Sequence, residues 1–111
     1  MKITLIQPSV GKINNKPYIK SWTMEPLALS TLAGLTPDDI EIEFLDERVD
    51  RLPESYETDL VAITVETYTA KRAYNIAKKI RSQGIPVVMG GIHANLVPDE
   101  VSKNCDAMLV G

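Results

Sequence analysis

The chain has 111 residues, of which 44% are hydrophobic and 24% charged, a composition typical of one soluble globular domain. Its net charge of −3 argues against a nucleic-acid binder, because phosphates require an excess of positive charge. No apolar run reaches the roughly 20 residues of a membrane span, and the single cysteine, Cys105, excludes an internal disulfide framework and any multi-cysteine metal site within this chain. We therefore expect one cytoplasmic domain, residues 1–111.

Five short apolar runs along the chain predict β-strands. The second run alternates apolar residues with Glu41 and Glu43, which is typical of an edge strand with one solvated face. The third run is continuously apolar, which is typical of a buried central strand. The five runs are residues 3–6, 40–45, 60–65, 86–89 and 107–110.

Helical patterns separate these runs. Pro26 suits a first helical turn, and Gly84 ends a second helix. The predicted helices are residues 26–35, 70–83 and 98–104, with one more short helix around 53–56. Strands that alternate with helices imply right-handed crossovers and a parallel sheet. We expect an α/β, Rossmann-like or flavodoxin-like, doubly wound five-stranded parallel sheet of strand order 2-1-3-4-5, with helices on both faces.

In such a sheet, ligands bind beyond the carboxyl ends of the strands, where the strand order reverses. Polar and small residues follow the predicted strands at this edge, and we take them as candidates for binding a cofactor, without a catalytic or metal-ligating role. The candidates are Gln7, Pro8, Ser9, Asp46, Arg48, Thr64, Glu66, Thr67, Gly90, Gly91, Ile92 and His93.

Gly90 and Gly91 directly follow the fourth predicted strand. Two glycines remove both Cβ atoms, permit positive φ and let a flat ligand approach the backbone closely. A tight turn without a ligand is the alternative, and the two residues alone leave both interpretations open. Near the third strand, Thr64 could face the ligand while Thr67 or Thr69 caps the following helix.

His93 is the only histidine, and without a Cys/His cluster a structural role is favoured over metal ligation. Cys105 is expected to be a small core residue. Residues 8–25 are long for a connection between a strand and a helix and contain Tyr18, Trp22 and Met24. Such a loop is typical of a lid, a ligand wall or a docking surface.

Several segments, taken in order, resemble the cobalamin-binding domains that are fused to radical S-adenosylmethionine enzymes. Asp46 falls where those domains carry an aspartate after the second strand, and residues 90–93 resemble their Gly-Gly-x-His stretch. The resemblance spans nearly the whole chain and points to the anaerobic magnesium-protoporphyrin IX monomethyl ester oxidative cyclase-like family. The matching segments are residues 26–33, 60–67, 90–94, 98–100 and 106–111.

One departure from related domains is informative. In the methionine-synthase type of cobalamin domain, an Asp-x-His-x-x-Gly motif follows the first strand and its histidine is cobalt's lower ligand, whereas residues 8–14 here contain no histidine. The resemblance therefore implies cobalamin bound base-off, with no histidine on cobalt. It also implies that Gly90 and Gly91 pack against the dimethylbenzimidazole tail, and that Thr64 replaces the serine of the family's Ser-x-Leu element.

The chain contains no Cys-x-x-x-Cys-x-x-Cys motif and stops within the family's fifth-strand signature. The resemblance thus implies an excised N-terminal domain, whose partner is a C-terminal radical S-adenosylmethionine domain of the same polypeptide. The 4Fe-4S cluster and S-adenosylmethionine would bind only there, so this chain alone should bind cobalamin and catalyse nothing. The alternative is a flavodoxin- or receiver-like domain that has lost its cofactor and serves in docking or regulation.

Overall fold

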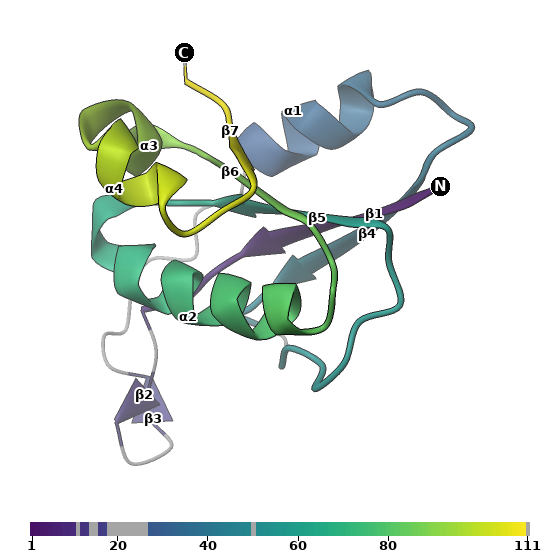
Figure 1. The fold of residues 1–111 in the computed structure, drawn as a ribbon. Coiled ribbons are helices and arrows are strands. Elements are labelled where there is room, and N and C mark those ends of the chain that lie inside the picture. Colours follow the sequence, from purple (N-terminus) through teal and green to yellow (C-terminus); the bar gives the residue numbers. More distant parts are fainter. Residues whose placement is uncertain (11, 14–15, 18–26, 50, 111) are drawn as a thin grey trace.

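The fold is built on one parallel sheet of five strands in the order β4-β1-β5-β6-β7 (Figure 1). A computed structural model describes residues 1–10, 12–13, 16–17, 27–49 and 51–110. The predicted order 2-1-3-4-5 is confirmed, as are the edge position of β4 and the central position of β5. The strands are β1 (Lys2–Gln7), β4 (Glu41–Asp46), β5 (Leu60–Thr64), β6 (Val87–Gly90) and β7 (Ala107–Met108).

The three longer predicted helices are present, as α1 (Leu27–Leu35), α2 (Ala70–Ser82) and α4 (Pro98–Ser102). The short helix expected around residues 53–56 is absent, and this prediction was wrong. The side chain of Gln83 accepts a hydrogen bond from the Tyr56 backbone N–H and donates one to the Glu54 carbonyl. Because the side chain of Gln83, directly after α2, satisfies these two backbone groups, they need no partners within the segment.

Four further elements are too short to produce a readable hydrophobic period. They are the antiparallel pair β2 (Lys12–Ile13) and β3 (Lys16–Pro17), the 3₁₀ helix η1 (Thr67–Thr69) and the helix α3 (Ile92–Leu96). The β2–β3 pair forms a sheet of its own, so the five main strands remain all parallel. Tyr18, Trp22 and Met24 of the long loop lie outside the described residues.

One face of the sheet is packed against α2, α3 and α4 (Figure 1). Alternate residues of the strands point to this face, and Ile63 packs there with Ala77 and Ile80 of α2 in a single core cluster. The same cluster contains Cys105, which is therefore a core residue as predicted. The exposed positions of α2 include Lys71, so the helix is amphipathic.

The opposite face of the sheet carries α1 (Figure 1). Leu5 of β1 and Leu29 of α1 are buried on this face. The prediction of helices on both faces is thus confirmed, although α1 is short and several apolar side chains on this side stay exposed, among them Leu35 and Leu109. No helix in the described part of the chain is long and apolar enough to cross a membrane.

Candidate functional site

A cavity of about 380 Å³ lies between α1 and the carboxyl-terminal halves of β5 and β6. Its walls are mainly apolar, and α3 together with the residue after β7 closes one side. The lining residues are Leu29, Leu32, Ala62, Ile63, Thr64, Val88, Gly90, Gly91, Ile92, Asn95 and Leu109. The volume and the apolar lining both fall in the range of small-molecule and cofactor sites in proteins.

Thr64 supplies a polar group in this cavity. Its side chain belongs to the last residue of β5 and is 5% exposed. Within the described residues, its hydroxyl makes no hydrogen bond to another protein group. Among the described residues, the Thr64 hydroxyl is not one of the fully buried side-chain atoms that lack a partner. It is therefore available to form a hydrogen bond with a ligand in the cavity.

The two glycines at the end of β6, Gly90 within the strand and Gly91 directly after it, are required for different structural reasons. Gly91 has a φ of +106°, and a Cβ built there would lie 2.8 Å from the Val65 carbonyl oxygen. The protein's own backbone thus requires glycine at this position. A Cβ on Gly90 would approach Leu109 at 3.5 Å, an ordinary contact, beside the cavity. The expectation that both missing Cβ atoms make room for a ligand is corrected: Gly90 can serve that purpose, and Gly91 serves the turn.

Polar residues form a row across the carboxyl ends of the strands on the α1 face. Asp46 of β4 is paired in register with Gln7 of β1, and Thr64 of β5 is paired with Gly90 of β6. Gln7 and Thr64 directly follow Ile6 and Ile63, which are paired in register between β1 and β5. The row therefore runs through four neighbouring strands. Gln7, Asp46 and Thr64 are all buried residues. The fold thus brings four sequence-predicted candidates from four separate segments into one line.

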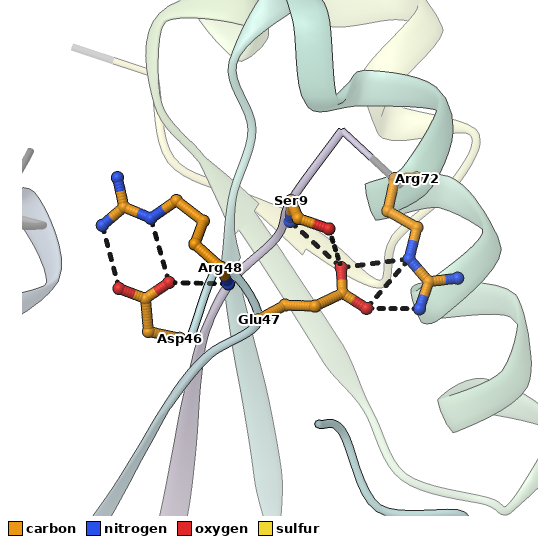
Figure 2. A network of polar contacts seen from close by, with 5 residues as sticks. All are labelled: Ser9, Asp46, Glu47, Arg48 and Arg72. Atoms are coloured by element: carbon orange, nitrogen blue, oxygen red, sulfur yellow. Dashed lines mark hydrogen bonds and ion pairs between the residues drawn. The ribbon is translucent and has the colours of Figure 1, made fainter. Parts of the chain in front are cut away.

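Asp46 fixes the side chain of Arg48 at one end of this row (Figure 2). The guanidinium donates through Nε to Oδ1 and through one amino group to Oδ2, both at 2.9 Å, and the Arg48 backbone N–H also donates to Oδ1. Burial by itself would raise the pKa of Asp46, but the hydrogen bonds and charge of Arg48 outweigh it and lower that pKa below its usual value. Asp46 is therefore an orienting group for Arg48.

Glu47 makes a second ion-pair network on the other side of the strand end (Figure 2). It accepts hydrogen bonds from the backbone N–H and hydroxyl of Ser9, both at 3.0 Å, and pairs with the guanidinium of Arg72 from α2. Burial would raise the pKa of Glu47, yet these donors lower it below the usual value. The network ties the end of β1 to the start of α2. Glu47 falls in a segment expected at the edge of the sheet, but no sequence pattern indicated that it pairs with Arg72.

His93 lies outside the cavity, although its neighbours Gly91 and Ile92 line it. Its Nδ1 is 3.2 Å from the Thr67 hydroxyl, and its Nε2 is 2.8 Å from a carboxylate oxygen of Glu100. Both ring nitrogens are thus engaged by the protein. The structural role that the sequence favoured agrees with this geometry. His93, also taken as a candidate for binding a cofactor, does not line the cavity.

Thr67 and Glu66 also make contacts within the protein. Thr67 or Thr69 was expected to cap the helix after β5, and the Thr67 hydroxyl contacts His93. Thr69 instead closes the turn, because its hydroxyl accepts from the Glu66 backbone N–H at 3.1 Å and donates to the Glu66 carbonyl at 3.3 Å. Glu66 enters these contacts through its backbone.

Four of the twelve candidates therefore line the cavity, namely Thr64, Gly90, Gly91 and Ile92. Five more lie at the ends of β1 and β4, namely Gln7, Pro8, Ser9, Asp46 and Arg48. Sequence reasoning missed the apolar walls, including Leu29, Ala62 and Val88. Ordinary apolar residues in helices and strands carry no local signal that they border a cavity. In the described ranges, no group of three or more His, Cys, Asp or Glu side chains is arranged to hold a metal ion.

Comparisons with known proteins give a partial identification. No family model and no solved structure matches the chain. The chain is 40% identical over 86 residues to bacteriochlorophyllide d C-8(2)-methyltransferase and 39% identical over 88 residues to bacteriochlorophyllide d C-12(1)-methyltransferase, both from Chlorobaculum tepidum. These alignments cover 77% and 78% of this chain but 19% of each methyltransferase, so the chain spans a minor part of their length.

A third relative is an uncharacterized methyltransferase of Pyrococcus horikoshii, 27% identical over 124 aligned positions that cover 100% of this chain and 27% of that protein. All three similarities support a relationship to methyltransferases. They do not support the oxidative-cyclase label that the resemblance suggested.

Proposed function

We propose that this chain binds cobalamin, base-off and without a histidine on cobalt, as the cofactor-binding part of a longer methyltransferase-like radical S-adenosylmethionine enzyme. The observation that carries the proposal is the apolar cavity at the carboxyl ends of β5 and β6, which is lined by Thr64, a threonine with no hydroxyl hydrogen bond within the described residues. The order of the family-like segments along the chain supports the identity of the ligand.

The cavity fits the tail of the proposed cofactor in chemistry. Dimethylbenzimidazole is flat and mostly apolar, which matches walls made of side chains such as Leu29 and Val88. Its ring nitrogen, freed when the base leaves cobalt, is an acceptor for the Thr64 hydroxyl. Gly90 lets the tail approach the backbone because no Cβ projects there. These residues would hold the tail, and Arg48 would lie at the same edge of the sheet.

The lower face of cobalt would have no protein imidazole. The sequence contains one histidine, and both nitrogens of His93 are engaged by Thr67 and Glu100 outside the cavity. When bound, cobalamin supplies a cobalt centre that can carry a methyl group, which agrees with the methyltransferase names of the relatives.

The catalytic step would belong to another domain of the same polypeptide. The methyltransferase relatives are much longer than the aligned segment, which is 19% of each. We assign the 4Fe-4S cluster and S-adenosylmethionine to that further domain, because this chain lacks the cysteines for a cluster. We also propose a cytoplasmic location, where the single thiol, Cys105, would stay reduced.

A cobalamin titration followed by visible absorbance tests the proposal. We expect the wild-type chain to bind with a base-off spectrum, and Gly90→Val to weaken binding by at least about tenfold, because its methyl groups would occupy cavity volume. Gly34→Val is the matched control, since a Cβ on Gly34 meets no atom within 4 Å. A wild-type chain that does not bind cobalamin overturns the proposal. Equal affinity of the Gly90→Val variant would remove this cavity from the site.

Electron paramagnetic resonance of the Co(II) form tests the ligation. A strong axial nitrogen produces superhyperfine splitting, and the proposal predicts that the complex shows none. Splitting that disappears in His93→Ala would identify His93 as the lower ligand. Splitting that persists in that variant would show that the cofactor keeps its own base on cobalt.

A further inference from the structure

One wall of the cavity is a helix too short to hold its own position. The wall consists of Gly91, Ile92 and Asn95, at and within the five-residue helix α3. A helix of one turn and a half has little stability of its own, because nucleation is unfavourable. The place of this wall must therefore be set by contacts between α3 and the rest of the protein.

The backbone supplies the first of these contacts. The Val65 N–H donates to the Gly90 carbonyl at 2.7 Å, and the His93 N–H donates to the Val65 carbonyl at 3.1 Å. These bonds wrap the loop around the end of β5. They attach the start of α3 to the sheet. They do not fix the orientation of the helix, which must depend on side-chain contacts.

The side chains of α3 divide between two directions. Ile92 and Asn95 are three residues apart, share one helix face and line the cavity. His93 and Ala94 lie on the other side of the helix, where Ala94 is fully buried and the His93 side chain is 12% exposed. His93 thus packs behind the wall that Ile92 presents to the cavity.

The imidazole of His93 contacts two other elements directly and reaches a third through Glu100. Its Nδ1 contacts the hydroxyl of Thr67 in η1 at 3.2 Å, and its Nε2 contacts Glu100 of α4 at 2.8 Å. The same carboxylate oxygen accepts from the hydroxyl of Tyr74 in α2 at 2.6 Å. The hydrogen bonds from Tyr74 and His93 lower the pKa of Glu100, so the carboxylate stays ionised as the acceptor of both.

We infer that His93 is a positioning residue, which holds the α3 wall of the cavity in its ligand-binding place through Thr67, Glu100 and Tyr74. The inference rests on the proposed function for the identity of the ligand, while the position of the wall is measurable without any ligand. It gives the histidine of the Gly-Gly-x-His stretch a role that needs neither cobalt nor direct contact with the cofactor.

Two measurements on the 111-residue chain test the inference, and the first uses no cofactor. Amide hydrogen exchange reports the protection of residues 91–96. We expect His93→Ala and Thr67→Val to lower this protection by about tenfold, the ratio that corresponds to one hydrogen bond to a polar or charged group. Thr67→Ser keeps the hydroxyl and should restore protection. Ser82→Ala removes a hydroxyl that donates to Lys79 at the far end of α2 and serves as the control.

The second measurement is the cobalamin titration of the same variants. We expect the dissociation constant to rise about tenfold in His93→Ala and Thr67→Val and to recover in Thr67→Ser, at unchanged far-ultraviolet circular dichroism. Unchanged protection in His93→Ala overturns the inference, and so does lost protection with unchanged affinity. A wild-type chain that binds no cobalamin overturns the proposed function instead, and the exchange data then decide separately whether His93 holds the wall.

Discussion

The two faces of the sheet are built from the same strands and differ in how they are covered. On the face of α2, α3 and α4, alternate strand residues such as Ile63 and Met89 are buried in one continuous core. On the face of α1, the intervening residues Ala62, Thr64 and Val88 border a cavity of about 380 Å³. Adjacent residues of β5 thus have opposite surroundings, because successive side chains of a strand point to opposite faces.

Within one strand, residues on the packed face therefore contribute mainly to stability, and residues on the cavity face contribute mainly to ligand binding. A close-packed face resists any change of volume, while a face with a cavity tolerates added volume but loses its binding space. Substitutions on the two faces should therefore differ in their effects on stability and on binding, and four pairs of variants test the structure.

The largest effect is expected on the packed face. Ile63 is 2% exposed, and Ile63→Ala should lower the free energy of unfolding by about 3 kcal/mol, measured by urea denaturation. Ala62→Leu on the cavity side should lower it by less than about 1 kcal/mol and abolish cobalamin binding, because the larger side chain fills the cavity. Equal destabilisation by both changes would show that the two faces are packed alike.

The two glycines at the end of β6 provide a second comparison, between a position strained by its backbone and one beside the cavity. Gly91→Ala should cost about 2 kcal/mol of unfolding free energy, because the residue has a φ of +106° and its Cβ would lie 2.8 Å from the Val65 carbonyl. Gly90→Ala should cost less than about 1 kcal/mol, because its Cβ makes an ordinary contact. Thermal unfolding of the two variants measures the difference. A Gly91→Ala variant as stable as Gly90→Ala would contradict the strain argument.

Acid unfolding tests the hydrogen-bond and ion-pair network of Glu47, which connects the end of β1 to α2. The pKa of Glu47 is lowered in the folded chain, so its stabilisation is complete above the unfolded value of about 4.3 and is lost as pH falls through the folded pKa. Glu47→Gln should lower stability by about 1.5 kcal/mol at pH 7 and by less at pH 3. Glu57→Gln, at an exposed carboxylate, is the control. A pH-independent effect of Glu47→Gln would rule out the ion pair as the cause.

The smallest effect concerns two buried threonines on opposite faces. Thr4 is 1% exposed, and its hydroxyl has no hydrogen-bond partner among the residues that the structure describes. Thr4→Val should raise stability by about 1 kcal/mol without changing cobalamin affinity. Thr64→Val on the cavity face should leave stability about the same and weaken cobalamin binding. Calorimetry and the absorbance titration measure the two outcomes. Equal cobalamin affinity in the two variants would remove Thr64 from the site.

The sheet could be derived from the sequence because each of its strands carries its own signal. Continuous apolar runs, a Glu-alternating edge strand and intervening helical patterns indicate a parallel sheet with right-handed crossovers. The order 2-1-3-4-5 is the common one for a doubly wound sheet of five strands. The features that the sequence did not predict correctly, the segment 53–56 and the helix α3, carry no such local signal. The segment at 53–56 is held by Gln83 from a distant helix, and α3 is shorter than the window in which a helical period can be read.

The sequence by itself determined the parallel sheet and the edge at which Gln7, Asp46, Thr64 and Gly90 gather, because strand direction and period are local properties of the chain. Only the tertiary structure decided that the cavity lies on the α1 face of the sheet. It also separated the turn-forming Gly91 from the space-making Gly90, and it placed His93 behind the cavity wall. These outcomes depend on distances between segments far apart in sequence, such as Gly91 to Val65 and His93 to Thr67, and no local pattern encodes such distances.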